Sequence, residues 1–114
     1  MTITIRSAAQ GDEAVVVRLV LEMADAEGWS SPVDEGYVRH FLASPGSGVL
    51  LALDGEEAVG LLSYCMTPGL FHAGDSGLIE LLIVTASRRG ECIGRRLVDT
   101  ALSLFEEAGC AEAS

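Results

Sequence analysis

The sequence contains few of the features that mark specialised classes of protein. Its three cysteines form no Cys-x-x-Cys pair and its two histidines form no cluster, so neither a disulfide framework nor a zinc site is indicated. No apolar run reaches the roughly 18–20 residues that cross a bilayer, and residues 1–6 lack the basic start and apolar core of a signal peptide. We therefore expect a cytoplasmic protein that holds no metal and does not enter a membrane.

Positive charge is also scarce. Lysine and arginine together number 7 against 17 acidic residues, which gives a formal net charge of −10. Binding to nucleic acid generally needs a basic surface that displaces counterions, so this balance argues against nucleic acid as a partner. An acidic surface favours a cationic substrate such as an amine, although it also has the simpler role of keeping a protein in solution.

Apolar sequence, by contrast, is plentiful enough for one globular domain. Hydrophobic residues make up 49% of the 114 residues, which is too high for a disordered chain. No repeat, low-complexity segment or linker divides the sequence. We expect a single domain over residues 1–114.

Periodicity and turn signals predict seven elements. Ser31 as a cap and Pro32 at the first helical position favour a helix start, and Asp54-Gly55 predicts a tight turn between two strands. Proline and glycine predict a loop over residues 67–77. The predicted order is a strand (2–6), two helices (11–27 and 31–42), three strands (49–53, 58–66 and 78–84) and a helix (93–108).

This order predicts an α/β fold with a mixed sheet. Residues 78–84 are apolar almost throughout, as in a strand that is buried on both faces. A strand followed by a packed helix normally returns to a parallel strand, and the sequence ends where that strand should begin. We therefore expect residues 78–84 to form an exposed edge, covered by a second copy in a homodimer, by strand exchange or by a partner.

Residues 88–96 connect this strand to the last helix and are the most informative stretch. A loop that opens a helix presents free N–H groups and the positive end of the helix dipole, which together bind phosphate. Glycine lets the backbone approach a ligand, and arginine adds fixed charge. The loop thus predicts a phosphate-bearing cofactor. The side chains of Arg88, Arg95 and Arg96 also have a simpler interpretation, as solvated charges at a helix start.

The element order and this loop together resemble the GNAT acetyltransferase superfamily over nearly the whole sequence. The acetyl-CoA motif of that family is arginine or glutamine, two residues, glycine, one residue, and glycine or alanine. Arg89 fills the first place and Gly94 the last, whereas Cys92 replaces the central glycine. If the backbone needs a positive φ there, a cysteine costs roughly 1 kcal/mol or more. The family continues through a further strand, helix and hairpin, so the resemblance describes a C-terminally truncated domain and assigns no general acid.

The resemblance implies acetyl-CoA as cosubstrate. Main-chain N–H groups of the loop would hold the pyrophosphate of coenzyme A, and the main chain at the end of strand 78–84 would pair with the pantetheine arm. The implied cofactor-binding residues are Leu82, Ile83, Val84, Arg89, Gly90, Glu91, Cys92, Ile93, Gly94 and Arg95.

Glu80 is the implied catalytic residue, because many members of this family have a glutamate there that helps to deprotonate the acceptor amine. Alternation places Glu80 on the same face as Leu82 and Val84, in an otherwise apolar strand. A carboxylate in such a place is costly unless it is paired or functional. The alternative is a structural hydrogen bond to a nearby donor.

The activity that the resemblance implies is transfer of an acetyl group from acetyl-CoA to a primary amine of a small molecule or peptide, by direct attack on the thioester. Phe71 and His72, in the predicted loop, are candidates for contact with the acceptor. Two alternatives stay open. The first is that the chain is a non-catalytic CoA-binding or interaction module. The second is that it is a fragment that needs a partner or a dimer to complete its fold.

Overall fold

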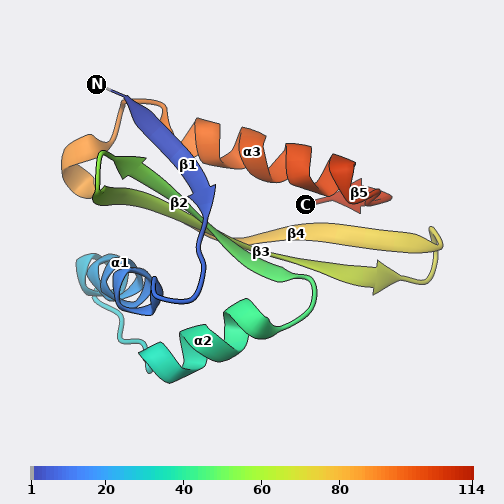
Figure 1. Cartoon of the computed structure of the whole chain (residues 1–114), viewed down its shortest axis with the longest axis horizontal. Coiled ribbons are helices and arrows are strands. Elements are labelled where there is room, and N and C mark those ends of the chain that lie inside the picture. Colours follow the sequence, from blue (N-terminus) through green and yellow to red (C-terminus); the bar gives the residue numbers. More distant parts are fainter. Residues whose placement is uncertain (1) are drawn as a thin grey trace.

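The computed structural model describes residues 2–114 and contains one five-stranded sheet with helices on both faces (Figure 1). The sheet has the order β1-β2-β3-β4-β5, in which the first four strands are antiparallel and β5 runs parallel to β4. This is the predicted mixed α/β fold. The elements are β1 (Ile3–Ser7), α1 (Glu13–Ala26), α2 (Glu35–Ala43), β2 (Ser47–Asp54), β3 (Glu57–Gly69), β4 (Gly74–Val84), a 3₁₀ turn η1 (Ala86–Arg88), α3 (Ile93–Glu107) and β5 (Glu112–Ala113).

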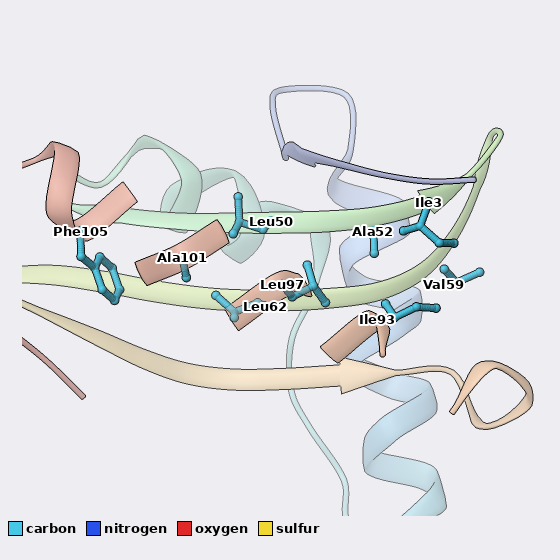
Figure 2. Close-up of a cluster of buried hydrophobic side chains, with 9 residues drawn as sticks. All are labelled: Ile3, Leu50, Ala52, Val59, Leu62, Ile93, Leu97, Ala101 and Phe105. Atoms are coloured by element: carbon cyan, nitrogen blue, oxygen red, sulfur yellow. The ribbon is translucent and has the colours of Figure 1, made fainter. Parts of the chain in front are cut away.

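Two apolar clusters form the core, one on each face of the sheet. Strand side chains alternate between the faces, so each strand contributes to both clusters. The cluster under α3 is drawn in Figure 2 and contains Ile3, Leu50, Ala52, Val59, Leu62, Ile93, Leu97, Ala101 and Phe105. The cluster under α1 and α2 contains Val16, Leu19, Val38, Val49, Leu51, Ala58, Leu61 and Ile83.

Helix α2 starts later than the sequence predicts. Asp34 is its N-cap, and the Asp34 carboxylate accepts a hydrogen bond of 2.8 Å from the N–H of Tyr37. Ser31 Oγ instead accepts a hydrogen bond from Val33 N–H at 3.2 Å, outside the helix. Aspartate and serine are comparable caps, and the first helical turn of this chain forms on the aspartate.

The predicted loop over residues 67–77 is wrong, because most of it is a strand hairpin. Strand β3 continues to Gly69 and β4 begins at Gly74. Pro68 is tolerated because β2 pairs with β3 only as far as Cys65, so Pro68 lies on an edge where no N–H is needed. Gly77 is a strand residue for a packing reason: a Cβ there would lie 2.4 Å from Cγ of Phe105, whose ring rests on the strand.

Strand β4 is not buried on both faces as predicted. Leu78 and Leu82 are 45% and 44% exposed. The outer edge of β4 pairs with β5 only at Ser76 and Gly77, and Ile79 N–H donates to the carbonyl of Ser114 at 2.9 Å. Within residues 2–114, no strand pairs with this edge beyond Ile79, so the predicted exposed edge is confined to residues 80–84.

Candidate functional site

A β-bulge in β4 sets the orientation of Glu80. Leu81 pairs with Ser63 and Ile79 pairs with Tyr64, so Glu80 is an extra residue in β4 with no partner of its own. Tyr64 packs under α3. Its neighbour Cys65 therefore lies on the opposite face, toward α1 and α2.

The carboxylate of Glu80 lies on this same α1 and α2 side. Glu80 Oε1 accepts a hydrogen bond of 3.1 Å from the Cys65 thiol. Burial, together with this carboxylate, raises the pKa of Cys65 to about 11, so the thiol keeps its proton at neutral pH. Leu82 pairs with Leu62 of the cluster under α3. The prediction that Glu80 shares a face with Leu82 and Val84 is therefore wrong, because a bulge resets the alternation.

The loop between η1 and α3 presents free main-chain donors. Gly90 has φ 88° and Cys92, the N-cap of α3, has φ 61°. No side chain caps the helix, and within residues 2–114 none of the N–H groups from Gly90 to Arg95 donates a hydrogen bond. The first-turn N–H groups of a helix point out of its N-terminal end and have no partner within the helix. These unpaired donors lie at the loop for which the sequence predicts a phosphate.

Arg88 ties this loop to the turn between β2 and β3. Its guanidinium lies 3.0 Å from Asp54 Oδ2, 3.8 Å from Glu57 Oε1 and 3.1 Å from Glu91 Oε1. Arg88 is therefore a structural residue and not a solvated charge. The side chain of Glu91 belongs to the same network, which leaves its main-chain N–H for the predicted role.

The three residues that open α3 differ in their surroundings. The side chain of Ile93 is buried in the cluster under α3, at 1% exposure, so only its N–H faces the loop. The Cα of Gly94 faces Val84 and Leu82, where an added Cβ would lie 3.6 and 3.7 Å from their side chains. Arg95 is exposed at the start of α3.

A groove of about 620 Å³ runs beside the end of β4 and leads to this loop. The predicted pantetheine-binding residues Leu82, Ile83 and Val84 line the groove together with Arg89. The opposite wall comes from the C-terminal part of α1 and the residues after it: Glu22, Met23, Ala26, Glu27 and Trp29. The structure thus brings the predicted strand residues and Arg89 together at one groove.

Phe71 and His72 do not reach this region. They lie at the tip of the β3–β4 hairpin, which projects beyond the rest of the sheet (Figure 1), and Phe71 is 93% exposed. His72 Nε2 lies 3.5 Å from Glu112 Oε2. Gly74 and Glu80 are six positions apart along β4, a distance of roughly 20 Å, so the tip cannot contact an amine held at Glu80.

Sequence reasoning missed several residues at the site. The Cys65–Glu80 contact depends on the bulge, and the Arg88 network depends on a turn 34 residues earlier; neither has a local sequence signal. Trp29 had one. The only tryptophan of the chain follows the helix-ending Gly28 and is 65% exposed. A large exposed aromatic residue of this kind indicates a contact surface.

Comparison with known proteins identifies the family. The sequence profile of the acetyltransferase (GNAT) family matches residues 19–114. The chain therefore belongs to the GNAT acetyltransferase family. No curated protein matches the sequence.

Solved structures show the same fold. An aminoglycoside acetyltransferase from an uncultured soil metagenomic sample superposes with a TM-score of 0.88 at 19% identity, over 98% of this chain and 75% of that one. The ribosomal-protein-alanine N-acetyltransferase from Brucella melitensis biovar Abortus 2308 superposes with a TM-score of 0.84 at 20% identity, over 98% of this chain and 77% of that one. A transcriptional regulator from Bacillus halodurans C-125 superposes with a TM-score of 0.83 at 28% identity, over 98% of this chain and 79% of that one.

The length and apolar content of the helices bear on membrane insertion. Among residues 2–114, no helix has both the length and the apolar content needed to cross a bilayer.

Proposed function

We propose that this chain transfers the acetyl group of acetyl-CoA to a primary amine. The observation that carries the proposal is the run of free N–H groups from Gly90 to Arg95 at the end of a groove lined by Leu82, Ile83 and Val84. An elongated ligand with a pyrophosphate at one end fits that sequence of features. Membership of the acetyltransferase family supports the same reaction.

The residues of the loop and groove fit acetyl-CoA in chemistry as well as in position. The N–H groups and the α3 dipole would hold the pyrophosphate, and the exposed Arg89 and Arg95 would add positive charge. Beyond Ile79 the outer edge of β4, opposite β3, has no strand partner within residues 2–114, so its main chain is available to an amide-bearing arm that pairs as a strand would. Bound acetyl-CoA supplies an activated acetyl thioester.

Glu80 is our candidate for the general base. An ammonium has no lone pair, so the acceptor amine must lose a proton before its nitrogen attacks the thioester carbonyl. The exposed carboxylate of Glu80 would accept that proton, directly or through water. As the C–S bond breaks, the attacking nitrogen would lose its second proton, and the departing thiolate of coenzyme A would take it up and leave as the thiol. The protonated Cys65 thiol fixes one carboxylate oxygen and leaves the other for the amine.

The free edge of β4 also bears on assembly. The pairing with β5 and the Ile79–Ser114 hydrogen bond cover residues 76–79, whereas residues 80–84 stay open. A homodimer or partner at this edge stays a prediction, as does a cytoplasmic location. The same edge cannot hold a partner strand and the pantetheine arm at once, so acetyl-CoA would compete with such an assembly.

Calorimetric titration with acetyl-CoA, followed by an assay of thiol release with a panel of amines, tests the proposal. We expect saturable binding and turnover. Absence of binding at millimolar acetyl-CoA would overturn the proposal, and binding without turnover would favour the non-catalytic module.

Glu80→Gln tests the role of the base. We expect kcat at neutral pH to fall by a factor on the order of 10²–10⁴ while acetyl-CoA binding is unchanged. Serine at position 65 provides the matched control, since Cys65→Ser keeps a neutral donor beside the carboxylate. A Glu80→Gln variant that loses cofactor binding but keeps its kcat would remove Glu80 as the base.

A further inference from the structure

A second cavity lies between the sheet and the two N-terminal helices. Its volume is about 710 Å³, and α1, α2 and the segment before α2 enclose it against β2, β3 and β4. The apolar part of its lining includes Val16, Val20, Phe41, Val49, Leu61 and Leu81. A cavity of this size and composition is typical of a site for a small organic ligand.

The polar groups of the lining select for positive charge. Ser31, Asp34, His40 and Ser63 contribute to the lining, and no arginine does within residues 2–114. Asp34 uses one carboxylate oxygen to cap α2. With no arginine in the lining to bind a carboxylate or phosphate, with the Asp34 carboxylate present, and with a formal net charge of −10 on the chain, the cavity suits a cationic ligand over an anionic one.

The position of the cavity connects it with the proposed chemistry. Its floor on β4 ends at Leu81, next to the bulge that carries Glu80. Ser63 lines the cavity and Cys65, two residues further along the same face, donates its hydrogen bond to Glu80. Ile83, one alternation beyond Leu81, lines the groove described above. Leu81 and Ile83 are separated by roughly 7 Å along the strand, so cavity and groove are neighbours on one side of β4.

From this arrangement we infer that the acceptor is an apolar primary amine, with an aromatic or branched alkyl group in the cavity and its amine at Glu80. This inference rests on the proposed acetyl transfer and names its substrate class. A polyhydroxylated amine such as an aminoglycoside fits less well, because the few polar side chains of the lining would not satisfy all of its hydroxyls and the rest would face apolar side chains. Phenethylamine has the required chemistry and serves as the probe.

The test measures binding separately from turnover. Acetyl-CoA is titrated first by calorimetry, and amines are then titrated in the presence of coenzyme A, which cannot donate an acetyl group. We expect phenethylamine to bind at least tenfold more tightly than ethylamine, since each methylene in an apolar pocket is worth about tenfold or more. We expect 2-phenylethanol, which has no charge, to bind more weakly than phenethylamine.

A pair of variants locates the binding. In Ser63→Phe a ring would occupy the cavity from its floor, and we expect phenethylamine binding to fall at least tenfold while acetyl-CoA binding is retained. Ser103→Phe places the same ring on the exposed side of α3 and should leave both affinities unchanged. Retained acetyl-CoA binding shows that Ser63→Phe has folded.

Three results would overturn the inference. The first is equal affinity for phenethylamine and ethylamine. The second is tighter binding of the aminoglycoside sisomicin, or of a peptide with an N-terminal alanine, than of phenethylamine. The third is no phenethylamine binding by protein that does bind acetyl-CoA. The last result leaves the proposed acetyl transfer intact. Conversely, phenethylamine binding by protein that fails to bind acetyl-CoA would overturn acetyl transfer but support the ligand class of the cavity.

Discussion

The two faces of the sheet are filled differently. Under α3 the side chains close against the strands, and two strand glycines make this possible. A Cβ on Gly60 would lie 3.1 Å from Ile93 Cγ2, and one on Gly77 would meet the ring of Phe105. On the other face, α1 borders both the cavity of about 710 Å³ and the groove of about 620 Å³. Both faces have a buried cluster, and the α1 and α2 face in addition borders the cavity and the groove.

The loop between η1 and α3 is held in place on two sides. The loop is fixed from behind by the packed face, through the buried side chain of Ile93, and from the side by Arg88 and its three carboxylates. Its free N–H groups lie beside the open face. A site held in this way is rigid before its ligand arrives, which lowers the entropic cost of binding.

The largest expected effect comes from two leucines, one on each face of the sheet. Leu62 is fully buried under α3 at 0% exposure, whereas Leu81 already borders the cavity. Leu62→Ala should lower the free energy of unfolding by about 3–5 kcal/mol, and Leu81→Ala by about 1–2 kcal/mol, because truncation beside an existing cavity loses fewer contacts. Urea unfolding measures both. Equal losses would show that the two faces are packed alike.

Substitution of Gly94 separates ligand binding from stability. The Cβ of valine fits beside Val84 and Leu82, but its two methyl groups would crowd these side chains, which line the groove proposed for acetyl-CoA. Gly94→Val should raise the Kd for acetyl-CoA at least about tenfold, or about 1.4 kcal/mol, with little change in unfolding. Gly94→Ala is the control and should bind nearly as well as the natural protein. A Gly94→Val variant with unchanged Kd would place acetyl-CoA elsewhere.

Substitution of Cys92 by glycine should have a smaller effect, and it should raise the free energy of unfolding. Its φ of 61° is a left-handed conformation that costs a residue with a Cβ roughly 1 kcal/mol. Cys92→Gly should therefore stabilise the fold by up to about 1 kcal/mol in urea unfolding. Cys92→Ala retains a Cβ and should gain nothing. Destabilisation by Cys92→Gly would mean that the thiol makes a contact that compensates for the strain.

The smallest effect is pH-dependent and lies at the start of α1. Arg6 binds the Asp12 carboxylate with two hydrogen bonds of 2.8 and 3.0 Å and thereby lowers the pKa of Asp12 below its usual range. A lowered carboxyl pKa stabilises the fold above about pH 4 and ceases to do so as the group protonates at lower pH. Asp12→Asn should thus be less stable by under about 1 kcal/mol at pH 7.

Unfolding at two pH values isolates this contribution. The difference between the natural protein and Asp12→Asn should shrink as the pH falls from 7 to 3. Asp25→Asn is a suitable control, because Asp25 is an exposed residue of the same helix. A difference that persists at pH 3 would assign the loss to helix capping and not to the ion pair.

The sequence predicts the order of the elements but not their extents. Hydrophobic spacing and the Asp54-Gly55 turn identify every major helix and strand, because these signals are local. Glycine and proline misled the prediction for residues 67–77. Gly77 is required because a Cβ would clash with the ring of Phe105. Pro68 is tolerated because the pairing of β3 with β2 stops at Cys65. Both reasons involve residues far away in the sequence.

The same distinction holds for the candidate site. The motif from Arg89 to Gly94 places the anion-binding loop, because a helix N-terminus is a local feature. The face of Glu80 could not be predicted, since a bulge has no reliable signature. The cavity under α2 also could not be predicted, because it results from how two helices pack on the sheet.

The order of strands in the sheet has a consequence for how the chain folds. Strands β2, β3 and β4 form a meander, so their pairings join near neighbours in the sequence. Local pairings close short loops and favour rapid folding. The pairings of Ser7 with Leu50 and of Ser76 with Glu112 close much longer loops, so they should form after the meander. In hydrogen exchange, the amides of β5 should therefore open first and those of the meander last.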